Sequence, residues 1–154
     1  MAITASSSQT TQRSPIKDPE LSKAFRKYDL LKLNPEATVS QVRRTGNLEL
    51  ITSKRVFDLQ LVPHDLRSKD YRSQVIGSNG VARTLPDTPV NTYKGVVSGL
   101  SDAQVRMTIT NNSIEGSIIT KSGRYFIQPA RSFSRSGVSG DGLPNLHPLL
   151  VEAD

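Results

Sequence analysis

The chain has 154 residues, with 20 Lys and Arg against 14 Asp and Glu, a net charge of +6, and no Cys or Trp. One domain is the default at this length, and a hydrophobic content of 35% indicates that only part of the chain builds a core. The absence of cysteine excludes disulfide scaffolds, thiolate metal sites and cysteine nucleophiles. No apolar run reaches the roughly 20 residues of a membrane helix. We therefore expect no membrane partner, and no secretory signal within the polar residues 1–11.

Positive charge is concentrated in the first half of the chain. Residues 1–72 carry 13 basic and 8 acidic side chains, whereas residues 73–154 carry 7 and 6. A basic half can bind nucleic acid or another polyanion, but here the two signs are interspersed, as on an ordinary solvated surface. The basic residues also lack the interleaved aromatic side chains on which bases stack. We expect no nucleic-acid partner.

The N-terminal third combines a polar lead with one helix. Residues 1–19 are rich in Ser, Thr and Gln and predict a disordered segment, and residues 28–33 predict a strand. Asn34 is a suitable N-cap for a helix over residues 35–45 that has proline at its first position. Gly46 supplies the stop.

From Gly46 onward the apolar residues alternate with polar ones, as in half-buried strands. Such runs cover residues 48–52 and 57–61, and weaker strands flank the Asn79-Gly80 turn over 71–76 and 81–85. The clearest region, residues 91–129, consists of four short strands with tight turns, an antiparallel meander whose buried face holds Val105, Met107 and Ile109. The sequence predicts an all-β, mainly antiparallel fold with one short helix. Two arrangements fit: a β-sandwich, or a partly open rolled barrel.

The domain boundaries follow from composition. Residues 20–130 form the predicted β-rich domain, and residues 131–142 are a predicted flexible linker rich in Ser, Gly and Arg. The remaining tail, 143–154, contains an apolar Leu149-Leu150-Val151 run that predicts one edge strand.

No motif for catalysis or metal binding is present. The two histidines, His64 and His147, are far apart and each lies beside a proline. No serine lies in a G-x-S-x-G elbow, and no glycine-rich phosphate loop follows a strand. We expect a protein that is not an enzyme and has no cofactor and no metal of its own.

Five segments in the same order resemble the N-terminal propeptide of reprolysin/adamalysin-type zinc metalloproteases, in the form found in secreted microbial precursors. The family pattern runs Phe-x-Leu-x-Leu, Tyr-x-Gly-x-Val-x-Gly, a Ser-x-x-x-Val strand, Gly-x-Ile and Tyr-x-Ile-Glu-Pro. Here these segments begin at Phe57, Tyr93, Ser101, Gly116 and Tyr125. Gln128 stands where the family has its closing glutamate.

The resemblance implies a secreted, non-catalytic prodomain that assists folding of a downstream zinc metalloprotease and keeps it latent. The partner would be that catalytic domain, in cis. A cysteine switch is impossible here, so latency needs steric occlusion or another zinc ligand, for which Asp141, Asp154 and His147 are the candidates.

The same interpretation assigns candidate contact and processing residues. Arg124 and Tyr125 are the candidate partner contacts, against the alternative that Tyr125 is core and Arg124 faces solvent. Arg131 and Arg135 are the candidate processing sites, against the alternative of ordinary solvated charges. Two further functions remain open: an extracellular β-sandwich module for binding or adhesion, and a polyanion-binding domain.

Overall fold

The computed structural model describes residues 19–133 and 147–153. Three helical segments are present in this part of the chain: α1 (Pro19–Ala24), α2 (Pro35–Thr45) and the 3-10 helix η1 (Ala130–Ser132). The strands, in chain order, are β1 (Tyr28–Leu30), β2 (Asn47–Ile51), β3 (Val56–Pro63), β4 (Gln74–Ile76), β5 (Ala82–Thr84), β6 (Thr92–Val97), β7 (Leu100–Ile109), β8 (Ile114–Thr120), β9 (Gly123–Pro129) and β10 (Pro148–Ala153).

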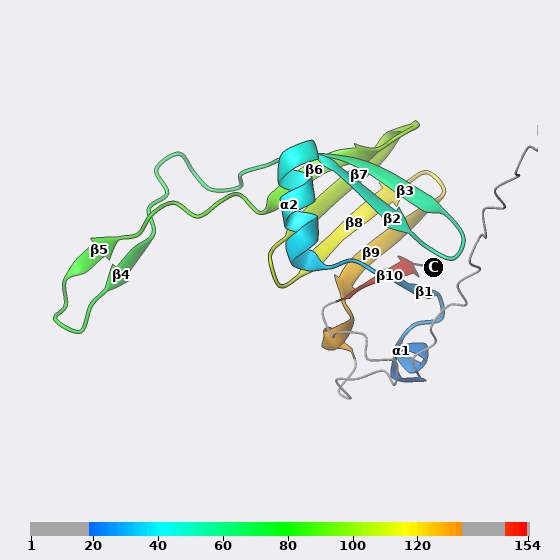
Figure 1. Cartoon of the computed structure of the whole chain (residues 1–154), viewed down its shortest axis with the longest axis horizontal. Coiled ribbons are helices and arrows are strands. Elements are labelled where there is room, and N and C mark those ends of the chain that lie inside the picture. Colours follow the sequence, from blue (N-terminus) through cyan, green and yellow to red (C-terminus); the bar gives the residue numbers. More distant parts are fainter. Residues whose placement is uncertain (1–18, 134–146, 154) are drawn as a thin grey trace, which may run out of the picture.

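Eight of these strands form one antiparallel sheet, in the order β1-β10-β9-β8-β7-β6-β3-β2, and the sheet curls into a half-barrel (Figure 1). Strands β4 and β5 form a separate two-stranded sheet that projects from the body. The predicted all-β, mainly antiparallel class is confirmed. Of the two arrangements left open, the structure has the rolled, partly open one.

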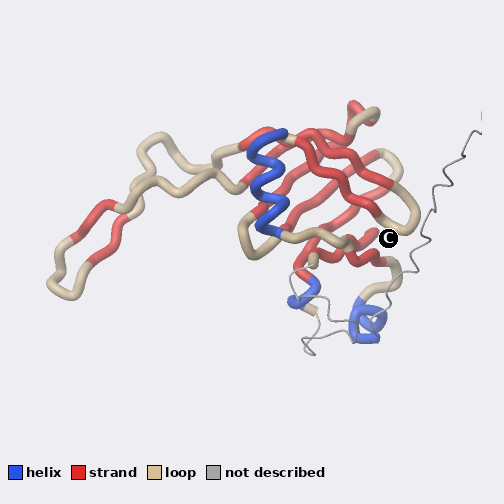
Figure 2. The backbone as a smooth tube through the Cα atoms, viewed as in Figure 1, coloured by secondary structure: helices blue, strands red, loops and turns tan. Residues whose placement is uncertain are grey.

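Local capping explains helix α2, which forms where it was predicted. The side chain of Asn34 accepts a hydrogen bond from the Ala37 amide at 3.0 Å. At the other end Gly46 adopts a left-handed backbone with φ of 71°. Val39 and Val42 face inward and join the same core as the sheet. The helix, drawn in blue in Figure 2, packs against β2 and β7.

The inner face of the sheet forms the core with the predicted register. Val105, Met107 and Ile109 are buried together, as their period-two spacing requires. Two glycines lie where the backbone of the neighbouring strand leaves no room for a side chain. A Cβ at Gly95 would lie 2.1 Å from the Gln60 carbonyl oxygen, and one at Gly116 would lie 2.3 Å from that of Arg106. No other residue fits at either position without moving the adjacent strand.

The strand predicted near the C-terminus is present, but its predicted position at the edge of the sheet is wrong. β10 lies inside the sheet, between β9 and β1, and Leu149 and Leu150 on it are buried. The folded domain therefore extends beyond residue 130 to at least residue 153. No local sequence pattern specifies which distant strands pair. The pairing of the C-terminal strand with β1 could therefore not be predicted from the sequence.

The structure also adds a second short helix, α1, to the one predicted. Leu21 on α1 is buried but lies outside the main core cluster, as does Leu149. Phe25 packs edge-on against Phe133, with ring centroids 4.8 Å apart. Phe133, within the predicted linker, is therefore packed against the residue that follows α1, whereas Arg131 and Ser132 are exposed. The rest of the linker, and residues 1–18 of the predicted disordered lead, lie outside the described residues.

None of the helices in the described part of the chain is both long enough and apolar enough to span a membrane.

Candidate partner-binding site

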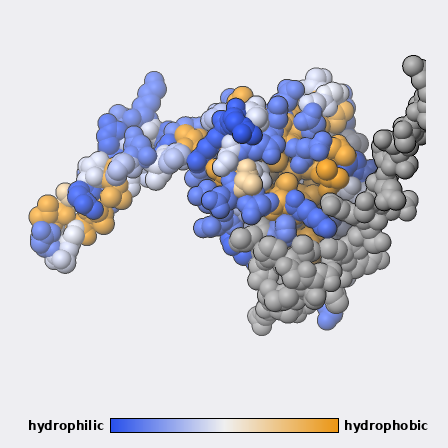
Figure 3. Space-filling model, viewed as in Figure 1, coloured by the Kyte–Doolittle hydropathy of each residue, from blue (hydrophilic) through white to orange (hydrophobic). Residues whose placement is uncertain are grey.

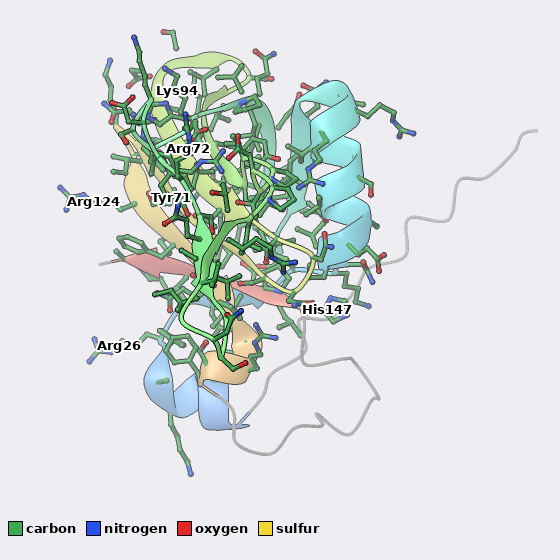
Figure 4. The ribbon with its side chains drawn as sticks, turned by 90° about the vertical axis from the view of Figure 1, so that its left-hand side faces the viewer. Arg26, Tyr71, Arg72, Lys94, Arg124 and His147 are labelled. Carbon is green, nitrogen blue, oxygen red and sulfur yellow. The ribbon has the colours of Figure 1, made fainter. Side chains whose placement is uncertain are left out.

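The two predicted contact residues lie on opposite faces of β9. Arg124 is exposed and points away from the body (Figure 4), whereas Tyr125 is only 2% exposed. The Tyr125 ring packs on Phe57 with centroids 4.9 Å apart, and its hydroxyl accepts a hydrogen bond from Arg55 Nη1. Tyr125 is therefore a core residue and not a contact on the outer face of β9. Adjacent residues of a strand face opposite sides, so at most one of the pair can reach a partner on the outer surface.

The processing and metal candidates are only partly described. Arg131 lies in η1 and is exposed, whereas Arg135, Asp141 and Asp154 lie outside the described residues. His147 Nδ1 is 3.1 Å from the Leu33 carbonyl oxygen, an acceptor, so this contact places the ring proton on Nδ1. Among the described residues no three His, Asp or Glu side chains gather in a group that could hold a metal ion.

The most distinctive surface of the molecule is the segment between β3 and β6, residues 64–91, which we call the arm. It carries β4 and β5 and extends well away from the half-barrel (Figures 1 and 2). All residues of β4 and β5 are exposed. Nothing in the described body therefore covers either face of this small sheet.

The root of the arm is fixed to the main sheet. The His64 amide donates to the Thr92 carbonyl oxygen at 2.8 Å, and the Thr92 hydroxyl donates to the His64 carbonyl oxygen at 2.6 Å. The β3–β6 pairing, which begins with Pro63 opposite Tyr93, thus continues by one residue pair. The arm leaves the body from a rigid attachment.

Arg67 ties together the two chain segments of the arm near its root. Its Nε and Nη2 donate to the two carboxylate oxygens of Asp65, at 2.8 and 2.7 Å. Its Nη1 donates to the Thr88 carbonyl oxygen at 2.8 Å. The guanidinium carbon also lies 5.6 Å from the centroid of the Tyr71 ring. One side chain thus joins the outgoing and the returning segment.

The Asp65–Arg67 pair shifts the acidity of both partners. The hydrogen bonds from Arg67 lower the pKa of Asp65 from 3.8 to about 2, because they stabilise the carboxylate. The same pair raises the pKa of Arg67. Both side chains are partly exposed, so solvent screens the interaction and its effect is local.

The tip of the arm is the predicted turn. Val81 donates its amide to the Asn79 side-chain oxygen at 3.2 Å, and Gly80 has a positive φ of 76°, a backbone conformation that glycine adopts without strain. Gly77 donates its amide to the Val81 carbonyl oxygen at 3.0 Å and closes the turn. The hairpin is well formed although no core supports it.

The arm exposes five large apolar side chains. Leu66 is 72% exposed and Ile76 71% exposed, and Tyr71, Val75 and Val81 are also exposed. Figure 3 shows hydrophobic residues gathered toward the far end of the arm, and Figure 4 shows Tyr71 and Arg72 on the arm, which faces the viewer. An isolated two-stranded hairpin is only marginally stable in water, and an exposed apolar patch typically meets a partner. The arm is therefore the candidate partner-binding site.

Lowering the pH should break the contact of Arg67 with Asp65 only under strongly acidic conditions. A depressed carboxyl pKa gives stability that is complete above pH about 4 and is lost as the pH falls through about 2. We expect an NMR titration of the Asp65 carboxyl to show a midpoint near pH 2, with the Arg67 and Thr88 resonances moving together. Asp65→Asn should already weaken the contact of Arg67 with Thr88 at neutral pH while the His64–Thr92 pairing is retained, whereas Asp70→Asn, also on the arm, should leave that contact unchanged. A midpoint near 3.8 would show that the pair does not form in solution.

Two features escaped the sequence analysis, although both left a signal. The connection between β3 and β6 is far longer than a hairpin loop, which typically has 2–5 residues, and such length indicates a functional segment. Arg55 is in phase with Phe57, so the same alternation that buries Phe57 directs Arg55 to the inner side of the sheet.

Neither the models of known protein families nor the curated protein sequences give a match to this chain.

Proposed function

We propose that the chain is a non-catalytic prodomain that assists the folding of a zinc metalloprotease and keeps it latent. The observation that carries this proposal is the arm, an exposed apolar hairpin held at its root by a rigid half-barrel. The resemblance described above supports it, because the five segments coincide with β3, β6, β7, β8 and β9, consecutive neighbours in the sheet. The shared pattern thus covers one continuous framework from which the arm projects.

The arm inhibits by occupying the protease's substrate cleft. A two-stranded sheet leaves both of its outer edges unpaired, and an extended segment can pair with a strand at the edge of a cleft by main-chain hydrogen bonds. Ile76 and Val81, near the tip, supply side chains for apolar pockets of the partner. Occlusion of this kind needs no cysteine, in agreement with a chain that has none.

The first test is the reading frame that encodes the chain. The proposal requires a catalytic domain with an H-E-x-x-H motif after residue 154. The second test uses that domain as a separately produced enzyme. Addition of the folded chain should slow its hydrolysis of a peptide substrate in a saturable manner. A Gly116→Val variant, which cannot keep the β7–β8 approach, is the unfolded control and should not inhibit.

Either of two results contradicts the proposal. One is a reading frame without any H-E-x-x-H domain, which would leave the binding or adhesion module as the better interpretation. The other is an unchanged rate of hydrolysis with the folded chain in large excess over the enzyme.

A further inference from the structure

A separate cavity lies where the two edges of the half-barrel approach each other. Strand β1 is at one edge of the sheet and β2 at the other, and the Ser53 amide in the β2–β3 turn donates to Asp29 Oδ1 on β1 at 2.9 Å. Beside this bridge is a cavity of about 360 Å³, which we call the mouth. Its size suits one small ligand or a single residue of a peptide.

The mouth contains an arginine that is held in place by aromatic rings. Arg55 Nη1 donates to the Tyr125 hydroxyl, and the guanidinium carbon lies 5.1 Å from the Tyr125 ring centroid and 5.9 Å from that of Phe57. Both rings are buried. The Arg55 backbone is also fixed, because its amide donates to the Thr52 hydroxyl at 3.0 Å. The guanidinium is thus positioned before any ligand arrives.

The positive charge of Arg55 is not neutralised within the described residues. None of the carboxylates described there lies within ion-pair distance of it, and its Nε and Nη2 make no hydrogen bond in that part of the chain. This edge of the guanidinium is the planar fork that matches a carboxylate with two parallel hydrogen bonds.

The remaining charges of the mouth also favour an anion. Among the residues that the structure describes, four basic and two acidic side chains line it, a net charge of +2. One oxygen of the acidic Asp29 is already engaged by the Ser53 amide. Glu152, the other acid, lies on β10. Arg26, one of the four basic residues, extends its side chain away from the body in Figure 4 and adds to the positive potential of the mouth.

We propose that the mouth binds a carboxylate attached to an aromatic or apolar group. The carboxylate pairs with the open fork of Arg55, and the apolar group lies against Phe57, Tyr125 and Leu150, which line the same cavity. Two sources carry this chemistry: a free aromatic acid, and the C-terminal residue of a peptide. The proposal does not depend on the prodomain function, because the arm and the mouth share no residue.

The test measures binding of defined probes to the full chain by NMR titration. We expect saturable shifts of the Arg55 and Tyr125 resonances with 3-phenylpropanoate and with acetyl-Gly-Phe that has a free carboxylate. The matching amides of both probes should bind at least about 10-fold more weakly, because a neutral amide forms no charge-assisted pair with the fork. The tighter of the two carboxylates identifies the source, free acid or peptide terminus. Equal binding of amide and carboxylate, or no saturable binding, would overturn the proposal.

Variants assign the binding to Arg55. Arg55→Gln should weaken the tighter carboxylate probe at least about 10-fold, and Arg55→Lys should restore only part of it, because the fork is lost while the charge remains. Arg124→Gln, which removes an arginine that points away from the body, is the matched control and should bind as the parent does. Tyr125→Phe keeps the ring and removes the hydroxyl that holds Arg55, so it should weaken binding even if Arg55→Gln fails to fold. Undiminished binding by folded Arg55→Gln, or by Tyr125→Phe, contradicts the assignment.

Discussion

A chain that ends at residue 146 is expected to lose the folded half-barrel rather than an accessory tail. β10 pairs with β9 over residues 148–153 and with β1 on its other side. It also buries Leu149 and Leu150, each worth about 1.5–3 kcal/mol of transfer free energy. Domains of this size are stable by only about 5–15 kcal/mol. The truncated chain should therefore show no cooperative thermal unfolding, and the newly exposed edge of β9 should promote aggregation.

Single substitutions on β10 show whether the loss of stability comes from the buried side chains or from the shortening of the chain. Leu150→Ala should lower the free energy of unfolding by about 2–5 kcal/mol, because it leaves a cavity in the main core. Val151→Thr on the same strand, at a half-buried position, should cost less than Leu150→Ala. The measurement is urea unfolding followed by circular dichroism. A truncated chain that melts cooperatively at the parent's temperature would show that β10 is dispensable.

Removal of the arm should abolish inhibition but leave the fold intact, in contrast to removal of β10. His64 and Thr92 are already paired by two hydrogen bonds, one between their backbones and one from the Thr92 hydroxyl to the His64 carbonyl oxygen. A two-residue Asn-Gly turn can therefore replace residues 65–91. The core residues all lie outside the replaced segment. We expect the unfolding temperature to change by only a few degrees. The inhibition constant against the catalytic domain should rise at least about 100-fold, as expected when the residues that dominate an interface are removed.

Two exposed isoleucines provide a matched comparison. Ile76 lies on the arm, and Ile119 lies on the body, in β8. Ile76→Ser should weaken inhibition about 10-fold, whereas Ile119→Ser should leave it unchanged. An armless chain that inhibits as well as the parent, or a larger loss with Ile119→Ser than with Ile76→Ser, would place the contact on the body instead.

Features with local causes were predictable from the sequence. Helix α2 begins and ends where Asn34 and Gly46 cap it, and alternation alone gave the correct buried face of β7. Features that depend on distant pairing were not predictable. The partnership of β10 with β1 joins residues more than 100 positions apart in the chain, and no local pattern in either segment specifies the other.

In the candidate site too, the local features were predictable and those that depend on distant contacts were not. The Asn79-Gly80 turn and its weak flanking strands were predicted, but their departure from the main sheet was not. β4 places Val75 and Ile76 side by side in the sequence, which breaks the alternation of a half-buried strand and indicates exposure on both faces. From the sequence Tyr125 is a candidate contact, because it lies near a strand start beside a turn, with a place in the core as the alternative; in the structure it is a core residue. Its burial arises from Arg55 and Phe57, which the curl of the sheet brings near it.

Amide hydrogen exchange of the arm, with and without the catalytic domain, tests the central claim most directly. In the free chain residues 74–84 should exchange quickly, because an isolated hairpin with no covered face opens easily, while β7 and β8 exchange slowly. Binding of the catalytic domain should slow exchange across residues 74–84 by at least about 10-fold and leave β7 and β8 unchanged, if the arm is the part that binds. A complex that forms while the arm exchanges as quickly as before would contradict the account.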